Sequence, residues 1–412
     1  MTNLLWPGDH RAGEHLTDQT VLRAMVAVES AWLSALAAAG LAPADAAGAD
    51  LSNLVDHQDI ETLAVAAEDS GNPVVALVEL LRRRAKPSIG PWIHRGLTSQ
   101  DVVDTALMMG VRDVADELRM QLRDQVSALA ALANTHRATP MVARTLTQQA
   151  APTTFGAKVA GWCTGLVDAY ERLGGLTTPI QVGGAVGTWS ATTELAALLT
   201  DAADPPEVAE RVVHSAAAAL GLAVRTPWHT ARTPVTAATD AFLACTDSWG
   251  RIASDVVVLV RPEIGELSEP AAEQRGGSSS MPHKRNPVLS ILIRRAALCA
   301  PQLAATLHTA AALANDERPD GAWHAEWDTL RTLTRRTVVA GSQCGELLAG
   351  LAVHAPRMAE NLSAANVLGE QQVIAELAGK PPSPTYFGAV DRLIDESLGR
   401  AERVVGKRSS GP

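Results

Sequence analysis

Residues 99–137 read SQDVVDTALMMGVRDVADELRMQLRDQVSALAALANTHR, and this stretch decides the fold class. It contains no proline and only one glycine, Gly110. Its apolar residues recur at the spacing of one helix face, at Val102, Ala106, Met109, Val114, Leu118, Leu122 and Val126. A helix over this stretch would be about 58 Å long at 1.5 Å per residue, longer than the diameter of a small domain. It therefore needs partner helices of similar length.

The rest of the chain supplies such partners. Helical spacing and helix-ending residues predict further helices over 17–40, 57–68, 73–84, 235–260, 288–313 and 324–350. We expect an all-α protein with three parts: an N-terminal helical domain (1–98), a central domain of long helices (99–350) and a small C-terminal helical domain (351–412). Several helices of this length are most easily buried when subunits associate, so we expect the long-helix bundle to form the core of an oligomer.

Composition narrows the classes of function. The formal charge of −10 argues against a nucleic-acid partner, which requires a basic surface. The four cysteines lie far apart, which favours neither a disulfide framework nor a zinc site and fits a reducing compartment. The N-terminus resembles no secretion signal, and no uninterrupted apolar run has the length of a membrane span. We expect a soluble cytoplasmic enzyme.

A second stretch carries the chemistry: residues 276–287 read GGSSSMPHKRNP. Glycines and serines make a loop that offers backbone N–H groups, and Lys284 adds a positive charge. A serine hydroxyl is a poor base in water, but cations and N–H donors in a dry site stabilise its alkoxide. The same donors would stabilise the enediolate-like charge of a carboxylate substrate that has lost a carbon-bound proton. A flexible Ser/Gly linker is the alternative, but the Met-Pro and Lys-Arg-Asn-Pro segments are too particular for one.

This segment meets every specified position of Gly-Ser-Ser-x-Met-Pro-x-Lys-x-Asn, and the chain resembles the fumarase/aspartase superfamily. The resemblance implies that Ser278 abstracts the proton α to a carboxylate while Lys284 and Asn286 support the site. It leaves open which of the three serines is best placed. It also implies a homotetramer whose active sites each draw on three subunits, with no cofactor or metal.

Two other segments agree with the resemblance. Residues 94–101, HRGLTSQD, are similar to a first conserved region, in which Thr98 and Ser99 would bind a substrate carboxylate at the start of the long helix. Helix N-termini favour anions, although plain N-capping is an alternative role for both residues. Residues 144–149, RTLTQQ, are similar to a second region. Most of the superfamily has a histidine at the position of Leu146, and that histidine serves the leaving group.

The absence of this histidine indicates the kind of reaction. A leaving hydroxyl or amine usually needs a proton donor, whereas a leaving carboxylate does not. The branch of the superfamily that dispenses with the histidine is 3-carboxy-cis,cis-muconate cycloisomerase, which adds a carboxylate across a C=C to form a γ-lactone in protocatechuate catabolism. We expect this reaction on a small polycarboxylate. Two alternatives stay open: a lyase with another good leaving group, such as nitrite from nitrosuccinate, and a catalytically silent structural paralogue.

Arg232 is expected to clamp a substrate carboxylate, because a guanidinium binds carboxylates in bidentate fashion. His324 and Glu326 are two residues apart on a helix and do not share a face, so no metal site is expected there. The expected catalytic residues are Ser278, Lys284 and Asn286. The expected substrate-binding residues are His94, Thr98, Ser99, Arg144, Thr145, Gln148, Arg232, Ser279 and Met281.

Overall fold

A computed structural model describes residues 3–272, 275–277, 280–281 and 284–406. Within these residues there are thirteen α-helices, four short 3-10 helices and four short strands, which confirms the all-α prediction. The chain forms two compact units, each assembled from three separate stretches. The first comprises Met1–Asp116, Leu176–Asp240 and Leu303–Arg335, and the second comprises Glu117–Gly175, Ala241–Gln302 and Arg336–Pro412. The units therefore do not correspond one-to-one to the three segments expected from the sequence.

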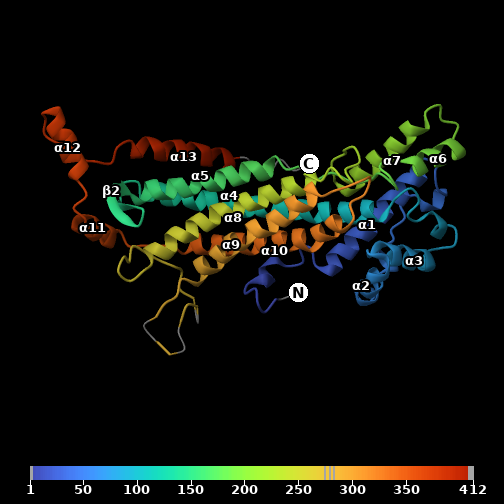
Figure 1. Cartoon of the computed structure of the whole chain (residues 1–412), viewed down its shortest axis with the longest axis horizontal. Coiled ribbons are helices and arrows are strands. Elements are labelled where there is room, and N and C mark those ends of the chain that lie inside the picture. Colours follow the sequence, from blue (N-terminus) through green and yellow to red (C-terminus); the bar gives the residue numbers. More distant parts are fainter. Residues whose placement is uncertain (1–2, 273–274, 278–279, 282–283, 407–412) are drawn as a thin grey trace. The chain divides into compact units, whose positions relative to one another are not determined.

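Four long helices contribute residues to both units, and they can be followed by their labels in Figure 1. They are α4 (Ser99–Thr135), α8 (Thr233–Leu259), α9 (Val288–Ala312) and α10 (Gly321–Ala349). In α4, apolar residues are completely buried along most of the helix, including Val102, Val111, Val114, Leu118, Leu122 and Val126. The helix starts and ends within two residues of the predicted limits because no proline interrupts it.

Within its described residues, the first unit also contains five further helices and the four 3-10 helices. These are α1 (Asp18–Ala38), α2 (Asp59–Ser70), α3 (Val74–Arg84) and α7 (Pro205–Leu220), with α6 (Ser190–Leu199) beside α7. The 3-10 helices are Asp9–Ala12, Ala44–Ala46, Ser52–Leu54 and Gly90–Trp92. Helix α1 packs against α7. Helix α7 was not predicted from the sequence.

The second unit contains α5 (Phe155–Gly174), which was also not predicted, and three C-terminal helices. These are α11 (Ala355–Ala364), α12 (Gly369–Ala378) and α13 (Val390–Val405). Helix α13 lies along α5 (Figure 1). Helix α11 packs against β1. Strands β1 (Pro140–Thr145) and β2 (Gln148–Thr154) form an antiparallel hairpin, and β3 (Leu267–Ser268) pairs with β4 (Ala352–Val353).

Two helices, α1 and α9, are long and apolar enough to span a membrane by length and composition alone. Core helices of soluble proteins meet the same criterion, and 56% of the apolar window of α1 is buried within the chain. Only 33% of the corresponding window of α9 is buried, and it leaves Ile291 and Leu298 exposed. An exposed apolar face on a long helix is what the expected association of subunits would cover.

Candidate active site

Asp101, in the first turn of α4, is the centre of a buried hydrogen-bond network in the first unit. Its fully buried carboxylate accepts hydrogen bonds from the backbone N–H groups of Thr98, Gly183 and Gly184 at 2.9–3.0 Å. The Gln181 amide donates at 3.0 Å. The network fixes the loop before α4 against the glycine-rich segment 183–187, because a buried carboxylate is stable only when its oxygens are satisfied.

His229 completes this network and explains one of the glycines. Its Nε2 lies 2.9 Å from Asp101 Oδ1, and only 4% of its side chain is exposed. A Cβ on Gly183 would stand 2.6 Å from the His229 ring and 2.9 Å from Gly187 Cα, so no larger residue fits. His229 is therefore a structural histidine that holds two loops together.

Of the expected carboxylate-binding residues in this unit, Thr98 and Ser99 stand half-buried at the N-terminus of α4. The backbone of Thr98 is fixed by Asp101. His94 lies four residues earlier, with Nδ1 2.6 Å from Glu29 Oε1 of α1. Its φ of +66° is uncommon for a residue with a side chain, and it indicates a conformation held by surrounding contacts.

The hairpin β1–β2 presents the second expected region. Thr145 pairs with Gln148, so Leu146 and Thr147 form a two-residue turn with φ of +47° and +73°. Such turns favour Asn-Gly, and a β-branched threonine there is a strained choice. Leu146 is 96% exposed, and Thr145 and Gln148 are exposed beside it. The hairpin therefore offers polar side chains for a ligand around an apolar residue that cannot donate a proton.

Arg144 anchors this hairpin. Its two terminal nitrogens donate to the two carboxylate oxygens of Glu266 at 2.8 and 3.0 Å, and Glu266 is fully buried. Asn361 Nδ2 donates to the same carboxylate at 2.8 Å. A substrate would have to share the Arg144 guanidinium with Glu266, so direct substrate binding by Arg144 stays a prediction.

The signature loop is closed at its base by Gly276 and Asn286. The Gly276 carbonyl accepts from the Asn286 backbone N–H at 2.8 Å and from Asn286 Nδ2 at 3.2 Å. Gly276 has a φ of +69°, and a Cβ there would clash with the Asn286 carbonyl. Met281 and Lys284 are exposed, while Ser278 and Ser279 lie outside the described residues.

A cavity of about 360 Å³ adjoins the base of this loop in the second unit. Asn286 and Arg285 line it together with Arg275, which forms an ion pair with Glu346, and with Glu269. Both oxygens of Glu269 accept from backbone N–H groups in the first turn of α9, at 2.8 and 3.0 Å. The cavity thus combines cationic and amide groups at the point where the signature loop leaves the helical framework.

The structure corrects the expectation for Arg232. Its guanidinium is buried, and Nη1 and Nη2 donate to both carboxylate oxygens of Asp104 while Nε and Nη2 donate to Glu326. The guanidinium also stacks over Trp228, 4.8 Å from the ring centroid. The second Nη1–H points to the carbonyls of Trp228 and His229, both at 3.4 Å. Arg232 therefore joins α4 and α10 within the first unit and has no donor left for a substrate.

Burial and ion pairing oppose each other in this cluster. Burial lowers the pKa of Arg232, but the neighbouring Asp104 and Glu326 carboxylates outweigh burial and leave the pKa raised. Desolvation raises the pKa of Glu326, while its bonds to Arg232 act in the opposite direction.

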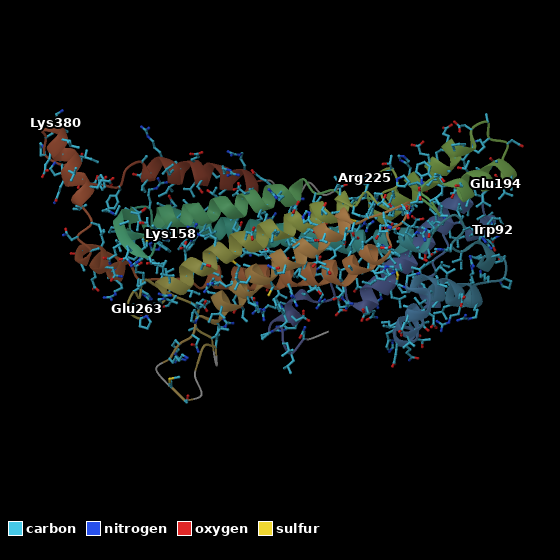
Figure 2. All side chains as sticks on the ribbon, in the orientation of Figure 1. Trp92, Lys158, Glu194, Arg225, Glu263 and Lys380 are labelled. Carbon is cyan, nitrogen blue, oxygen red and sulfur yellow. The ribbon has the colours of Figure 1, made fainter. Side chains whose placement is uncertain are left out.

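Lys158, labelled in Figure 2, forms a longer ion pair than Arg232 does: its Nζ lies 3.6 Å from Asp255 Oδ2 within the second unit.

The expected residues thus fall in both units. His94, Thr98, Ser99 and Arg232 belong to the first unit, and Arg144, Thr145, Gln148, Met281, Lys284 and Asn286 belong to the second. No group of three or more histidine, cysteine, aspartate or glutamate side chains within the described ranges is placed to hold a metal ion.

Sequence reasoning missed the buried acids that hold these residues: Glu29, Asp104 and Glu266. One signal was available for Glu29. It lies on the apolar face of α1, between the buried residues Val28 and Trp32, where an unpaired carboxylate would be unstable. An acid at such a position predicts a specific partner, but it does not say which one.

Long helices joined by this signature loop define a class of lyase, and comparison with known proteins places the chain in it. A family model described as lyase matches residues 10–300, more than half of the chain. The chain belongs to the fumarase/aspartase superfamily of lyases.

The most similar proteins include two enzymes at the same level of identity. The nitrosuccinate lyase of Streptomyces davaonensis is 40% identical over 96% of this chain and 94% of its own length. The 3-carboxy-cis,cis-muconate cycloisomerase of Bradyrhizobium diazoefficiens is 40% identical over 85% of this chain and 76% of its own length. The crystal structure of a 3-carboxy-cis,cis-muconate lactonizing enzyme from Pseudomonas putida has a TM-score of 0.78 at 31% identity, over 96% of this chain and 88% of that one.

Proposed function

We propose that this enzyme is a β-elimination lyase that expels an anion without protonating it, and that its substrate is a nitrosuccinate-type dicarboxylate. Ser278 takes the proton from the carbon next to a carboxylate. The C–N bond then breaks, its electron pair leaves with nitrite, and a C=C bond forms to give fumarate. Leu146 carries the proposal, because an exposed leucine stands where most of the superfamily has the histidine that serves the leaving group.

Identity and coverage taken together favour this substrate over the cycloisomerase substrate. Nitrosuccinate lyase is 40% identical over 96% of the chain, whereas two cycloisomerases are 40% identical over 85% and 36% identical over 97% of it. This supports a lyase of the nitrosuccinate kind, which likewise needs no proton donor for its leaving group.

Cycloisomerisation of 3-carboxy-cis,cis-muconate is the second candidate. Several relatives with this name and the solved structure at a TM-score of 0.78 support it. In the lactonising direction Ser278 would protonate the carbon next to a carboxylate. Read backwards, this reaction is also an elimination with a stable anion, a carboxylate, as the leaving group. Both candidates therefore make the same demand on the site.

In either reaction, we assign Thr98 and Ser99 to one substrate carboxylate at the positive end of α4. Lys284 and Asn286 stabilise the charge that develops when the proton leaves. We further propose a homotetramer in the cytoplasm, with each active site shared between subunits, because the resemblance to the superfamily implies this assembly and α9 exposes an apolar face. The chemistry requires neither a metal nor a cofactor.

A side-by-side assay separates the two candidates. The purified enzyme is incubated with nitrosuccinate, followed by nitrite release, and with 3-carboxy-cis,cis-muconate, followed by lactone formation. We expect nitrite release to be faster by at least about tenfold in kcat/KM. Faster lactone formation would make the chain a cycloisomerase, and inactivity on both substrates would reject the proposal.

Alternative substrates and the variant Leu146→His test whether the leaving group departs without a proton donor. A carboxylic acid has a pKa near 4, so its anion leaves unaided, whereas hydroxide is the conjugate base of water at about 15.7. The wild-type enzyme should therefore produce no fumarate from malate or aspartate. Histidine tolerates the positive φ of position 146, so the variant should fold, yet we expect no gain in kcat/KM on nitrosuccinate. Fumarate formed from malate by the wild type would show that another group supplies the proton.

A further inference from the structure

Glu29 is a buried acid that faces the expected substrate-binding loop. It lies on α1, its side chain is completely buried, and Oε1 is 2.6 Å from His94 Nδ1. Its other oxygen, Oε2, is buried and has no hydrogen-bond partner within the described part of the chain. Because a buried carboxylate is costly unless it is paired, the bond to His94 is the contact that accounts for an acid at this position.

The backbone around His94 is held on both sides. Arg82 Nη2 donates to the carbonyl of Ile93 at 2.8 Å, and Trp32 Nε1 donates to the carbonyl of Arg95 at 2.6 Å. Trp32 lies three residues after Glu29, so one face of α1 contacts both the His94 side chain and the neighbouring carbonyl. Three separate contacts thus fix a histidine whose φ of +66° would otherwise be disfavoured.

Two histidines of this unit bind a completely buried carboxylate, and they differ in exposure. His229, bound to Asp101, is 4% exposed and enclosed by Gly183 and Gly187. The His94 side chain is 17% exposed although Glu29 is completely buried. The carboxylate therefore covers the Nδ1 edge of the His94 ring, while part of the ring stays accessible four residues before Thr98.

We propose that Glu29 is a positioning residue: it accepts the Nδ1–H of His94, fixes the tautomer, and thereby presents Nε2 of His94 to the substrate beside Thr98 and Ser99. A carboxylate oxygen accepts a hydrogen bond, so the proton of the neutral ring stays on Nδ1 and Nε2 keeps its lone pair. His94 touches the substrate, and Glu29 acts only through His94. The identity of the substrate in this inference rests on the proposed function. The tautomer of the His94 ring does not depend on it.

The kinetic test is a double-mutant cycle with Glu29→Gln and His94→Asn, in which asparagine is chosen because it tolerates a positive φ. Glutamine has the same shape as glutamate but can donate as well as accept, so the tautomer is no longer fixed. We expect Glu29→Gln to lower kcat/KM about 10- to 100-fold, as when carboxylates that orient metal-bound histidines are removed. In the His94→Asn background the same change should cost less than about threefold, because coupled residues are not additive.

A second measurement requires no substrate. With histidine labelled at ¹³Cδ2, the carbon shift distinguishes the two neutral tautomers, and His94→Asn identifies the His94 signal. Glu29→Gln should move the His94 signal and leave that of His229 in place, which serves as the internal control. This readout still applies if the enzyme proves inactive on both proposed substrates.

Two results would overturn the inference: an equal kinetic loss from Glu29→Gln in both backgrounds, or a His94 signal that does not respond to the substitution. If Glu29 were purely structural, Glu29→Gln would lower the unfolding temperature and would also give one of the two results that overturn the inference. If Glu29→Gln is too unstable to purify, Glu29→Asp replaces it, because aspartate keeps the carboxylate but withdraws it by one methylene from Nδ1. The same two measurements, and the same two overturning results, then apply to Glu29→Asp.

Discussion

The loop before α4 and the signature loop are built in opposite ways. In segment 94–101 the backbone and side chains are bound by buried partners, with Asp101 at the centre and His94 held by Glu29. In segment 276–287 the Gly276 carbonyl accepts hydrogen bonds from Asn286 at the base, and the Met281 carbonyl accepts one from the Lys284 backbone N–H. Buried side chains from other elements therefore hold the first loop, whereas these described bonds of the second join residues of the same segment.

This difference matches two different tasks. Binding a substrate carboxylate benefits from donors that are already oriented, because their ordering then costs nothing on binding. A serine that must act as a base benefits from surroundings that exclude water when the substrate is present. The contacts of Thr98 and Ser99, to which we assign a substrate carboxylate, can therefore be read from a single chain, whereas the proton transfer proposed for Ser278 depends on what surrounds the signature loop.

The largest expected effect is in the signature loop. Ser278→Ala should lower kcat by at least about 10²- to 10⁴-fold, the usual value of general acid–base catalysis, with little change in substrate binding. Initial rates of nitrite release and binding of unreacted substrate to the variant measure the two quantities. Ser279→Ala is the comparison variant: as an expected substrate-binding residue, Ser279 should affect KM more than kcat. If Ser279→Ala loses activity while Ser278→Ala keeps it, the proton carrier has been assigned to the wrong serine.

A large effect on stability is expected in the framework behind the first loop. Arg232→Met leaves Asp104 and Glu326 buried without the cation that neutralises them, which should cost about 3–5 kcal/mol in the free energy of unfolding. Thermal unfolding at one fixed protein concentration measures the loss.

Arg211→Met is the control, because Arg211 and Glu207 form an exposed pair at 3.0 Å and should contribute under about 0.5 kcal/mol. A stable Arg232→Met variant whose KM alone is raised would show that Arg232 binds a substrate carboxylate. Arg232 would then not be part of the framework that holds the first loop.

The smallest expected effect concerns the base of the signature loop. Gly276→Ala places a Cβ against the Asn286 carbonyl at a φ of +69°, which should cost roughly 1–2 kcal/mol and reduce kcat several-fold. Gly277→Ala is the matched control, since among the described residues its Cβ would come nearest to the Arg285 side chain, at 3.9 Å, without a clash. Equal behaviour of the two variants in unfolding and turnover assays would show that the Gly276–Asn286 contact does not fix this loop.

Much of the fold could be predicted from local patterns. Helices α1, α4, α8, α9 and α10 lie within a few residues of their predicted limits, because their apolar periodicity and the positions of proline and glycine act locally. Helices α5 and α7 and the hairpin β1–β2 were missed. The hairpin could not be predicted from an Asn-Gly turn, because Leu146 and Thr147 occupy the turn. Both adopt positive φ values that their residue types disfavour.

The sequence by itself determined the fold class, the superfamily and the missing leaving-group histidine, because each depends on residue type at fixed spacing along the chain. Only the tertiary structure decided what each polar residue contacts. It bound Arg232 to Asp104 and Glu326, and it brought Glu29 to His94 across 65 residues. The physical reason is that a charge entering a core must find a partner in space, and the partner's position in the sequence follows from the packing of helices, which no local pattern encodes.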